Sequence, residues 1–331
     1  MRKLIKILLI FTVVFTITAC NKNDTSDTVK NIDIEWNSDN NLADVIRFKI
    51  EAIDTTKQIT PDVIGDSYTY FGPADENNYL VDLILWMTNT TDQDIHLNSS
   101  FSGLFITEDT NHKAAVLSLN DDGTILSDSD LLSAGSTKKI HYYAEMPEKS
   151  LQKEIEFELS NQKQDSDKQE ISPVCASLKF EVNKTSNNYE TKNMGEVINL
   201  DGYADVTLTG ANIIKELRPA SPAGLYNTYT VQQESNSLVD FSVVINNISG
   251  NDINAGNVIT ARLLDVNSNS YPATVVYEDD NHSNLQNATS ITIKNNQSAI
   301  IHYLFEVSDE VVNESKKIRI SWQGNVYLIN L

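Results

Sequence analysis

The sequence predicts an all-β protein built from two β-sandwich domains in tandem. Three observations support this prediction: apolar residues recur at every second position, turn residues separate these runs, and the second half of the chain repeats the first. A strand with one apolar face needs a second sheet to cover that face, and a sandwich provides the cover. A chain of 331 residues is long enough for two such domains.

The composition excludes several classes of protein. The chain has 25 Lys and Arg against 46 Asp and Glu, a formal charge of -21, whereas a nucleic-acid-binding surface needs a basic stripe. A hydrophobic fraction of 40% is too high for a disordered chain. With 12 Gly and 7 Pro the chain is neither collagen-like nor of low complexity. We therefore expect a globular protein with no nucleic-acid partner.

The N-terminus has the pattern of a secretion signal. Arg2, Lys3 and Lys6 precede an apolar run over residues 7–15. This run is too short to span a membrane comfortably, and small residues follow it.

Residues 17–20, Ile-Thr-Ala-Cys, resemble the lipobox of bacterial lipoproteins, in which the cysteine is acylated and becomes the first residue of the mature chain. The resemblance implies a signal peptide over residues 1–19, a lipid on Cys20 and a tether over residues 20–30. It also implies a location on the extracellular side of the cell membrane, where the lipid holds the protein. An ordinary signal peptide with an accidental cysteine is the alternative.

The second cysteine, Cys175, has no partner in the chain if Cys20 carries a lipid, so we expect no structural disulfide. Cys175 lies in a strand-like stretch over residues 174–182, at a position of the opposite parity to the apolar residues. We therefore expect an unpaired thiol on the less buried face. A catalytic thiol would need a neighbouring base, and the local sequence supplies none.

The chain contains an internal repeat. Residues 79–89 align with residues 237–247 without a gap, and the His-Tyr pair at 141–142 recurs at 302–303. Such self-similarity indicates duplicated structural units. We expect two homologous domains, over residues 31–183 and 195–331, joined by a polar linker over residues 184–194.

The strands follow in order along each copy. Val81, Leu83, Leu85 and Met87 share one face of a strand, since side chains alternate between faces. Single helical turns are expected over residues 147–153 and 309–315. The remaining predicted strands cover residues 140–144, 155–159, 174–182, 239–247, 318–322 and 327–331.

Each copy resembles the immunoglobulin-like domains, mostly of unassigned function, on secreted and lipid-anchored proteins of Gram-positive bacteria. The resemblance depends on the long apolar strand that ends in Asn, at 81–89 and 239–247, and on the acidic turn after it. The segments 104–109 and 263–267 and the turn before the His-Tyr strand complete it. It implies a fold and a location, and it transfers no catalytic residue.

Candidate metal sites in the sequence are incomplete. His141 and His302 occupy equivalent positions, but a metal needs further converging ligands, so we interpret the pair as a product of duplication. Residues 265–269 have the oxygen spacing of a calcium loop but lack its Gly and its bidentate Glu. The acidic runs 121–122 and 278–280 leave a weak shared calcium site open. We expect no resident metal and no cofactor.

One outward-facing pair differs between the copies. Ile84 and Trp86 stand where the second copy has Ser242 and Val244. A large apolar pair on an outward face is either covered by other chain or forms a contact surface. Cover by residues 32–36 is one interpretation. The other is that Trp86 contacts a partner or the second domain.

No phosphate-binding loop, nucleophile elbow or cysteine-rich cluster is present. We therefore expect a non-catalytic, lipid-anchored binding or spacer module, with a surface protein or the cell wall as its partner, and not an enzyme. A solute-binding lipoprotein of an importer is the alternative, followed by a secreted hydrolase with an unrecognised carboxylate pair.

Overall fold

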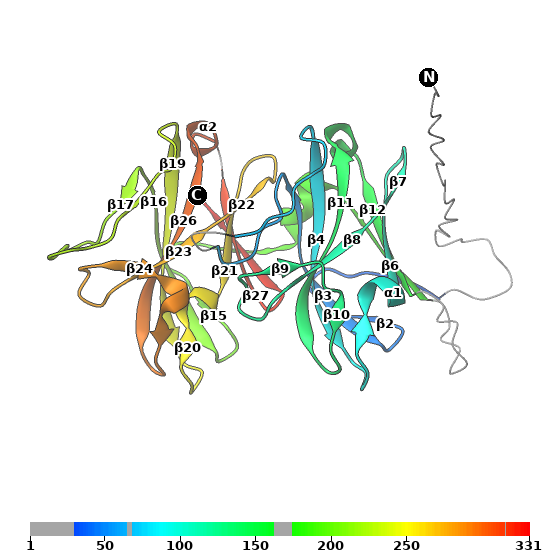
Figure 1. The fold of residues 1–331 in the computed structure, drawn as a ribbon, viewed down its shortest axis with the longest axis horizontal. Coiled ribbons are helices and arrows are strands. Elements are labelled where there is room, and N and C mark those ends of the chain that lie inside the picture. The colour runs from blue at the N-terminus through cyan, green and yellow to red at the C-terminus, as the bar shows by residue number, and fades with distance from the viewer. Residues whose placement is uncertain (1–29, 65–67, 162–173, 315) are drawn as a thin grey trace, which may run out of the picture.

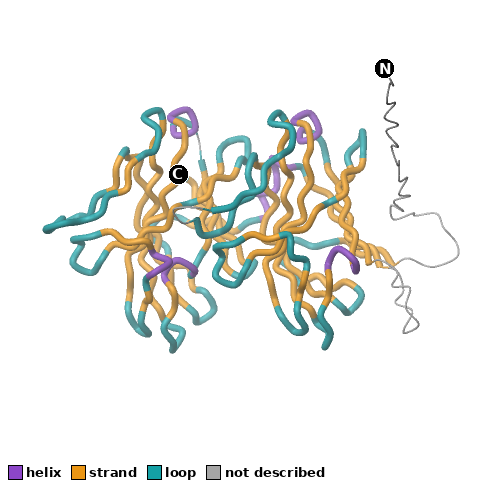
Figure 2. The backbone as a smooth tube through the Cα atoms, viewed as in Figure 1, coloured by secondary structure: helices purple, strands orange, loops and turns teal. Residues whose placement is uncertain are grey.

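The computed structural model describes residues 30–64, 68–161, 174–314 and 316–331. Within these residues the chain is almost entirely β, as predicted, and its strands form two similar sandwiches that lie side by side (Figure 1). Loops connect the ends of the strands, and the helices are short turns (Figure 2). No helix among the described residues is long and apolar enough to cross a membrane.

The first sandwich consists of a six-stranded sheet and a five-stranded sheet. In spatial order, the six-stranded sheet contains β2 (Asn40–Leu42), β3 (Ile46–Thr56), β4 (Asn78–Asn89), β11 (Thr137–Pro147), β8 (Ala115–Leu119) and β9 (Leu126–Ser127). The five-stranded sheet contains β1 (Lys30–Asp33), β13 (Val174–Phe180), β12 (Ile155–Asn161), β6 (Phe101–Ile106) and β7 (Asn111–Lys113). The remaining elements are β5 (Ile95–His96), β10 (Leu131–Leu132), α1 (Leu97–Ser100) and the 3-10 turn η1 (Glu148–Gln152).

The second sandwich repeats this topology strand for strand. Its six-stranded sheet contains β15 (Val197–Asn199), β16 (Ala204–Ile214), β19 (Asn236–Asn247), β26 (Ser298–Ser308), β23 (Thr274–Glu278) and β24 (Leu285–Asn287). Its five-stranded sheet contains β14 (Glu190–Lys192), β28 (Asn325–Asn330), β27 (Lys317–Trp322), β21 (Thr260–Leu264) and β22 (Ser270–Pro272). Two small ribbons pair β17 (Glu216–Leu217) with β18 (Tyr229–Thr230) and β20 (Ile253–Asn254) with β25 (Thr292–Ile293). The helical turns of this sandwich are η3 (Ala255–Asn257), η4 (Ala288–Ser290) and α2 (Asp309–Val312), whereas η2 (Val182–Asn188) packs its Val182 into the core of the first sandwich.

Each sandwich has its own apolar core between its two sheets. In β4 the alternating residues Val81, Leu83, Leu85 and Met87 all point into the first core, as their spacing predicts. The two helical turns expected from the sequence are present as η1 and α2.

The repeated asparagines that end β4 and β19 have the same role in both copies. The Asn89 side chain donates to the carbonyls of Gln93 (2.7 Å) and Leu132 (3.0 Å) and accepts from the Thr91 amide and hydroxyl. Asn247 makes the equivalent contacts with its own turn and with Ile293. The repeat therefore preserves an apolar pattern and also this buried hydrogen-bonded turn around Asn89 or Asn247, which we call the Asn joint.

The segment predicted as a polar linker, residues 184–194, is built into the fold instead. Residues Glu190–Lys192 form β14, which pairs in parallel with β28 and so starts the second sandwich. The preceding Tyr189 is buried, and its ring meets that of Trp36 edge to face at 6.1 Å between centroids. The polar composition of these residues predicted a linker. A three-residue edge strand buries few side chains, so its sequence can be polar throughout.

Cys175 also differs from its prediction. Its side chain is 2% exposed and it is disulfide-bonded, so the expected unpaired thiol on a less buried face is wrong. The only other cysteine in the sequence, Cys20, lies outside the described residues.

Candidate functional site

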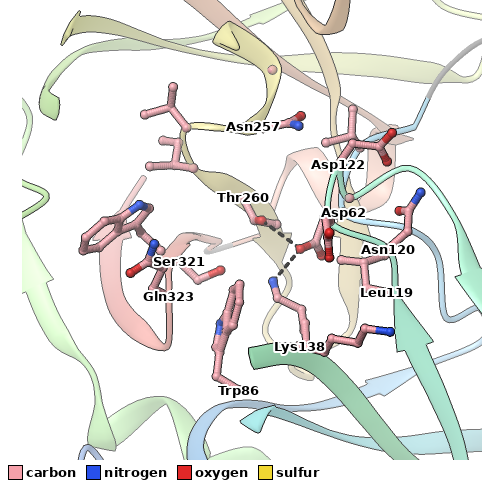
Figure 3. A pocket seen from close by; sticks show the side chains of 18 of the residues that line it. Asp62, Trp86, Leu119, Asn120, Asp122, Lys138, Asn257, Thr260, Ser321 and Gln323 are labelled. Carbon is pink, nitrogen blue, oxygen red and sulfur yellow. Dashed lines mark hydrogen bonds and ion pairs between the residues drawn. The ribbon is translucent and has the colours of Figure 1, made fainter. Parts of the chain in front are cut away.

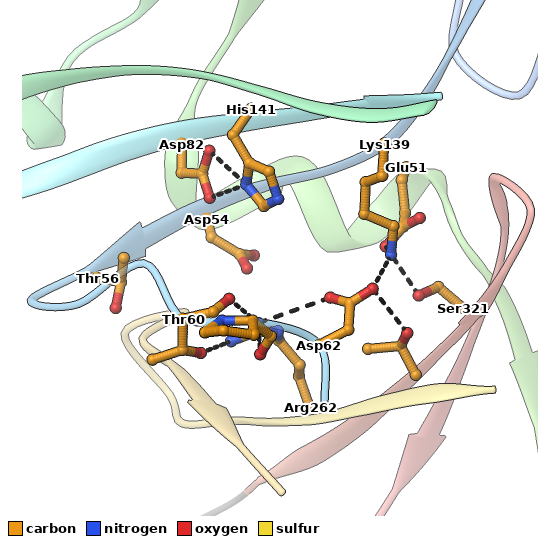
Figure 4. A network of polar contacts seen from close by, with 12 residues as sticks. Glu51, Asp54, Thr56, Thr60, Asp62, Asp82, Lys139, His141, Arg262 and Ser321 are labelled. Carbon is orange, nitrogen blue, oxygen red and sulfur yellow. Dashed lines mark hydrogen bonds and ion pairs between the residues drawn. The ribbon is translucent and has the colours of Figure 1, made fainter. Parts of the chain in front are cut away.

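The sandwiches meet through a buried cluster of charged side chains, which we call the junction network. It joins the outer face of the six-stranded sheet of the first sandwich to the outer face of β21 and β27 in the second (Figure 4). The first sandwich supplies three acids and one lysine, and the second supplies two arginines, so the charges balance. The members are Glu51, Asp54, Asp62, Lys139, Arg262 and Arg319.

Asp54 and Arg319 form a bidentate ion pair in the network. The guanidinium of Arg319 donates through both terminal nitrogens to the two oxygens of Asp54, with Nη2 2.8 Å from Oδ2. Such bidentate pairs combine charge with fixed geometry. Burial alone would raise the pKa of Asp54, but the charge and hydrogen bonds of Arg319 outweigh it and hold this pKa below its ordinary value. Asp54 therefore stays ionised at neutral pH.

Lys139 connects the other two acids. Its ammonium donates to Glu51 at 2.8 Å and also to Asp62. Burial opposes the charge of Lys139, yet the neighbouring Asp62 and Glu51 raise its pKa. The same contacts, with Arg262 near by, lower the pKa of Asp62 against the effect of its burial.

Hydroxyl groups of the second sandwich complete the hydrogen bonding of these acids. Thr260 donates to Asp62 at 3.0 Å, and Ser321 donates to Glu51 at 2.9 Å. Arg262 donates to the hydroxyl and the carbonyl of Thr60 at 3.2 and 3.1 Å. Because Asp54 and Asp62 are held ionised and fully bonded, they are poor general acids at neutral pH.

A β-bulge turns Glu51 toward the second sandwich. The register between β3 and β4 shifts between Ile50 and Ala52, which leaves Glu51 as the extra residue. Bulges re-aim side chains in this way. The second copy has the same bulge, with Thr209 in that position, so the bulge is inherited and the charge is particular to the first copy.

The outward pair Ile84 and Trp86 is covered by chain of this protein. Ile84 is 3% exposed, whereas Trp86 is partly buried and donates from Nε1 to Glu51 at 2.5 Å. A Cβ added to Gly324, in the turn between β27 and β28, would lie 3.2 Å from the Trp86 ring. The second sandwich therefore contacts Trp86, while Trp36 of the N-terminal segment packs on Tyr189 instead.

Beside the network lies an open pocket of about 350 Å³, which we call the junction groove. Both sandwiches line it: Gln323 and Ser321 lie across from Asn120 and Asp122, with Trp86 and Asn257 between them (Figure 3). The lining also includes Tyr203 and Trp322, whose rings stack at 6.0 Å between centroids and 24° between planes. The groove exists only because the two sandwiches are held together.

The repeated histidines each pair with a repeated aspartate. His141 Nδ1 lies 2.9 Å from Asp82, and His302 Nδ1 lies 2.9 Å from Asp240. Burial would lower the pKa of His302, but Asp240 and then Glu278 raise it above its ordinary value. The two histidines lie in different sandwiches and do not converge on one site.

The acidic loops are occupied by their own backbone. Asp265 accepts from the amides of Asn267 and Asn269 at 2.8 and 2.9 Å, as a turn does. Asp279 accepts from the amide and hydroxyl of Ser283 at 2.6 and 2.7 Å. Among the described residues no group of three or more His, Cys, Asp or Glu side chains could hold a metal ion.

The sequence did not reveal the junction network. Its members come from five distant segments: five are ordinary charged residues in strands, and Asp62 lies in the loop between β3 and β4. A usable signal was the difference between the copies at the bulge, where Glu51 stands in the place of Thr209. The predicted lipid site, Cys20, lies outside the described residues.

Comparisons with known proteins add little to this account. No protein-family model matches the chain, and no curated protein matches it. Among solved structures, an uncharacterised β-sandwich protein from Clostridium difficile 630 is similar at 17% sequence identity and a TM-score of 0.40. The match covers 43% of this chain and 95% of that protein. The all-β assignment rests on the sheets of this chain.

Proposed function

We propose that this chain is a cell-surface lipoprotein of a Gram-positive bacterium, held to the membrane through Cys20, that acts as a non-catalytic binding module. The observation that carries the proposal is the junction network, which joins two sandwiches through buried, fully paired charges. A bare spacer needs only a chain of domains, whereas this junction builds a groove from both of them. The groove is the surface that we assign to binding.

The rival functions fit this arrangement less well. Solute-binding lipoproteins of importers usually have α/β folds with substantial helix, and this chain is all-β. A hydrolase would need a carboxylate free to exchange a proton, whereas Asp54 and Asp62 are held ionised by their neighbours.

The anchor is tested with two matched variants, Cys20→Ser and Cys175→Ser. One sulfur cannot carry both a thioether-linked lipid and a disulfide, and Cys20 is the one other cysteine of this sequence. The proposed anchor therefore requires that the lipidated protein lacks the disulfide of Cys175, and the variants separate the roles of the two cysteines. After expression in a Gram-positive host with labelled palmitate, we expect Cys20→Ser to lose the label and the membrane fraction. Cys175→Ser should keep both. Equal labelling of the two variants would contradict the anchor.

Binding is tested by crosslinking the intact protein on living cells and comparing it with Trp322→Ala, which removes one wall of the junction groove. We expect captured surface material that is reduced in the variant. Tyr226→Ala, an exposed aromatic residue on the loop between β17 and β18, is the matched control. Capture of nothing by the unaltered protein would favour the spacer role over the binding role.

A further inference from the structure

The junction groove has aromatic walls contributed by both sandwiches. Trp86 comes from β4, and Trp322 and Tyr203 come from the second sandwich, where their rings stack. All three side chains are partly exposed. Trp and Tyr that stay accessible in a concave site offer flat, polarisable faces together with a polar edge, which suits ligands that are only partly apolar.

The hairpin turn between β27 and β28 fixes the position of Trp322 in the groove. Gln323 and Gly324 both have positive φ, at 45° and 76°, as a tight two-residue hairpin requires. Gly324 leaves room for Trp86 and Lys49, because a Cβ would lie 3.2 Å and 3.1 Å from them. The turn therefore places Trp322 and Gln323 in the groove without disturbing the network beneath.

Hydrogen-bond donors and acceptors surround the aromatic walls of the groove. The exposed amides of Asn257 and Gln323 make no hydrogen bond to other described residues, so each offers a donor and an acceptor to a ligand. Asp121 adds an exposed carboxylate, whereas Asp62 is already bonded to Lys139 and Thr260. The free groups are thus mostly neutral amides.

The charge of the groove restricts its ligand. The chain carries a net charge of -21, and the groove is lined by Asp121 and Asp122, by Lys138, and by Asp62 and Lys139, which pair with each other. The net charge of both the lining and the whole chain is therefore negative, so a phosphate polymer or another polyanion is repelled. A strongly cationic peptide would need several unpaired carboxylates, whereas Asp62 is paired with Lys139, and Lys138 lies in the same lining as the exposed Asp121 and Asp122. A neutral ligand with both donors and acceptors remains.

We propose that the junction groove binds a neutral glycan chain, an inference that rests on the proposed binding function and names its ligand class. A sugar ring presents a face of C–H bonds, which packs on the rings of Trp86 and Trp322. Around its edge it presents hydroxyls that both donate and accept, which the amides of Asn257 and Gln323 satisfy. The groove is open to solvent, so it admits a stretch of a longer chain as well as its end.

The test is calorimetric titration of the full-length protein with three neutral probes: chitotetraose, cellotetraose and maltotetraose. We expect at least one probe to bind. Trp322→Ala should weaken it by about tenfold or more, and Asn257→Ala and Gln323→Ala by about threefold each, the effect of losing a single hydrogen bond. Gln152→Ala, an exposed glutamine in η1 outside the groove, is the matched control and should bind as the unaltered protein does.

Asn257→Ala and Gln323→Ala change exposed side chains, so they report on binding even if Trp322→Ala disturbs the fold. The glycan proposal is overturned if none of the three probes binds, if binding is the same in all groove variants, or if oligolysine binds in their place. If the protein captures surface material through the groove while no oligosaccharide binds or competes, the glycan proposal fails and the binding function stands. If it captures nothing, the binding function itself fails.

Discussion

Each acid of the junction network has a cation beside it, and this pairing decides how the site responds to mutation. Removing two charges from water is costly, and a buried pair regains that cost only when its geometry is good and its remaining hydrogen bonds are made. Arg319 and Asp54 meet this condition through two parallel bonds. A buried ion pair is thus a weak source of stability but a strong constraint on how the two sandwiches are placed.

The first prediction concerns Arg319→Met, which leaves Asp54 buried without its main partner. We expect the free energy of unfolding at neutral pH to fall by about 3–5 kcal/mol, the usual cost of breaking a buried pair. Urea unfolding measures the change. The double variant Asp54→Leu with Arg319→Met removes both charges and should recover most of the loss.

Arg218→Met is the matched control, because its side chain is 61% exposed and its ion pair with Glu216 lies at the surface. It should leave stability nearly unchanged. A loss in Arg319→Met no larger than in this control would show that the network does not hold the sandwiches together.

The second prediction concerns His302, whose pKa is raised by Asp240 and Glu278. Because the folded pKa lies above the unfolded value near 6.5, His302 contributes stability that is fully present below pH 6.5 and is lost as the pH rises through the folded pKa. His302→Gln should therefore flatten the decline in unfolding free energy on the alkaline side of pH 6.5. Asp240→Asn, which removes the partner, should flatten it as well. An unchanged pH profile in both variants would contradict the assignment.

At the scale of single elements, the two copies are alike in their joints and different in their outer faces. The Asn89 and Asn247 joints have the same four contacts. Buried polar groups of this kind are costly to leave unpaired. Duplication has therefore kept the joints, while the exposed positions of the strands were free to change.

The third prediction follows from these joints. Asn89→Ala and Asn247→Ala should each lower the free energy of unfolding by about 2–3 kcal/mol, since each leaves buried backbone groups without a partner. Thermal and urea unfolding of the two variants provide the measurement. Asn246→Ala is the control, because the hydrogen bond that the Asn246 side chain accepts from Ser298 is long at 3.4 Å. Unequal losses in Asn89→Ala and Asn247→Ala would argue against equivalent joints.

The elements that the sequence predicts well are those with many alternating apolar residues. The strand over residues 81–89 falls within β4, and the strand over 239–247 falls within β19. Strand β3 was harder to predict, because the bulge at Glu51 reverses its alternation between Ile50 and Ala52. Short edge strands such as β14 carry no periodic signal, so polar composition misled the prediction there.

At the scale of the whole molecule, the sequence predicts two sandwiches but not how they meet. Asp54 and Arg319 are far apart in the chain, and nothing local to either position indicates its partner. The junction groove follows from that placement, so it was beyond prediction as well. Trp86 was predicted to make a contact, because a large outward side chain in only one of two copies requires a cover.

The junction network also accounts for the function that we propose. A groove shared by two domains is useful for binding only when the domains keep one relative orientation, since the cost of ordering them would otherwise be subtracted from the affinity. Buried charges that pair in a single geometry supply that order in advance. The shape of the proposed binding site therefore depends on the junction network.

The most direct test of this account is to measure residual dipolar couplings of backbone amides in both sandwiches of the full-length protein. We predict that one alignment tensor fits both sets of couplings, because the junction network holds the sandwiches as one rigid body. Arg319→Met should then separate the two sets. Couplings in the unaltered protein that require two tensors of different magnitude would contradict the rigid junction, and with it the shared groove.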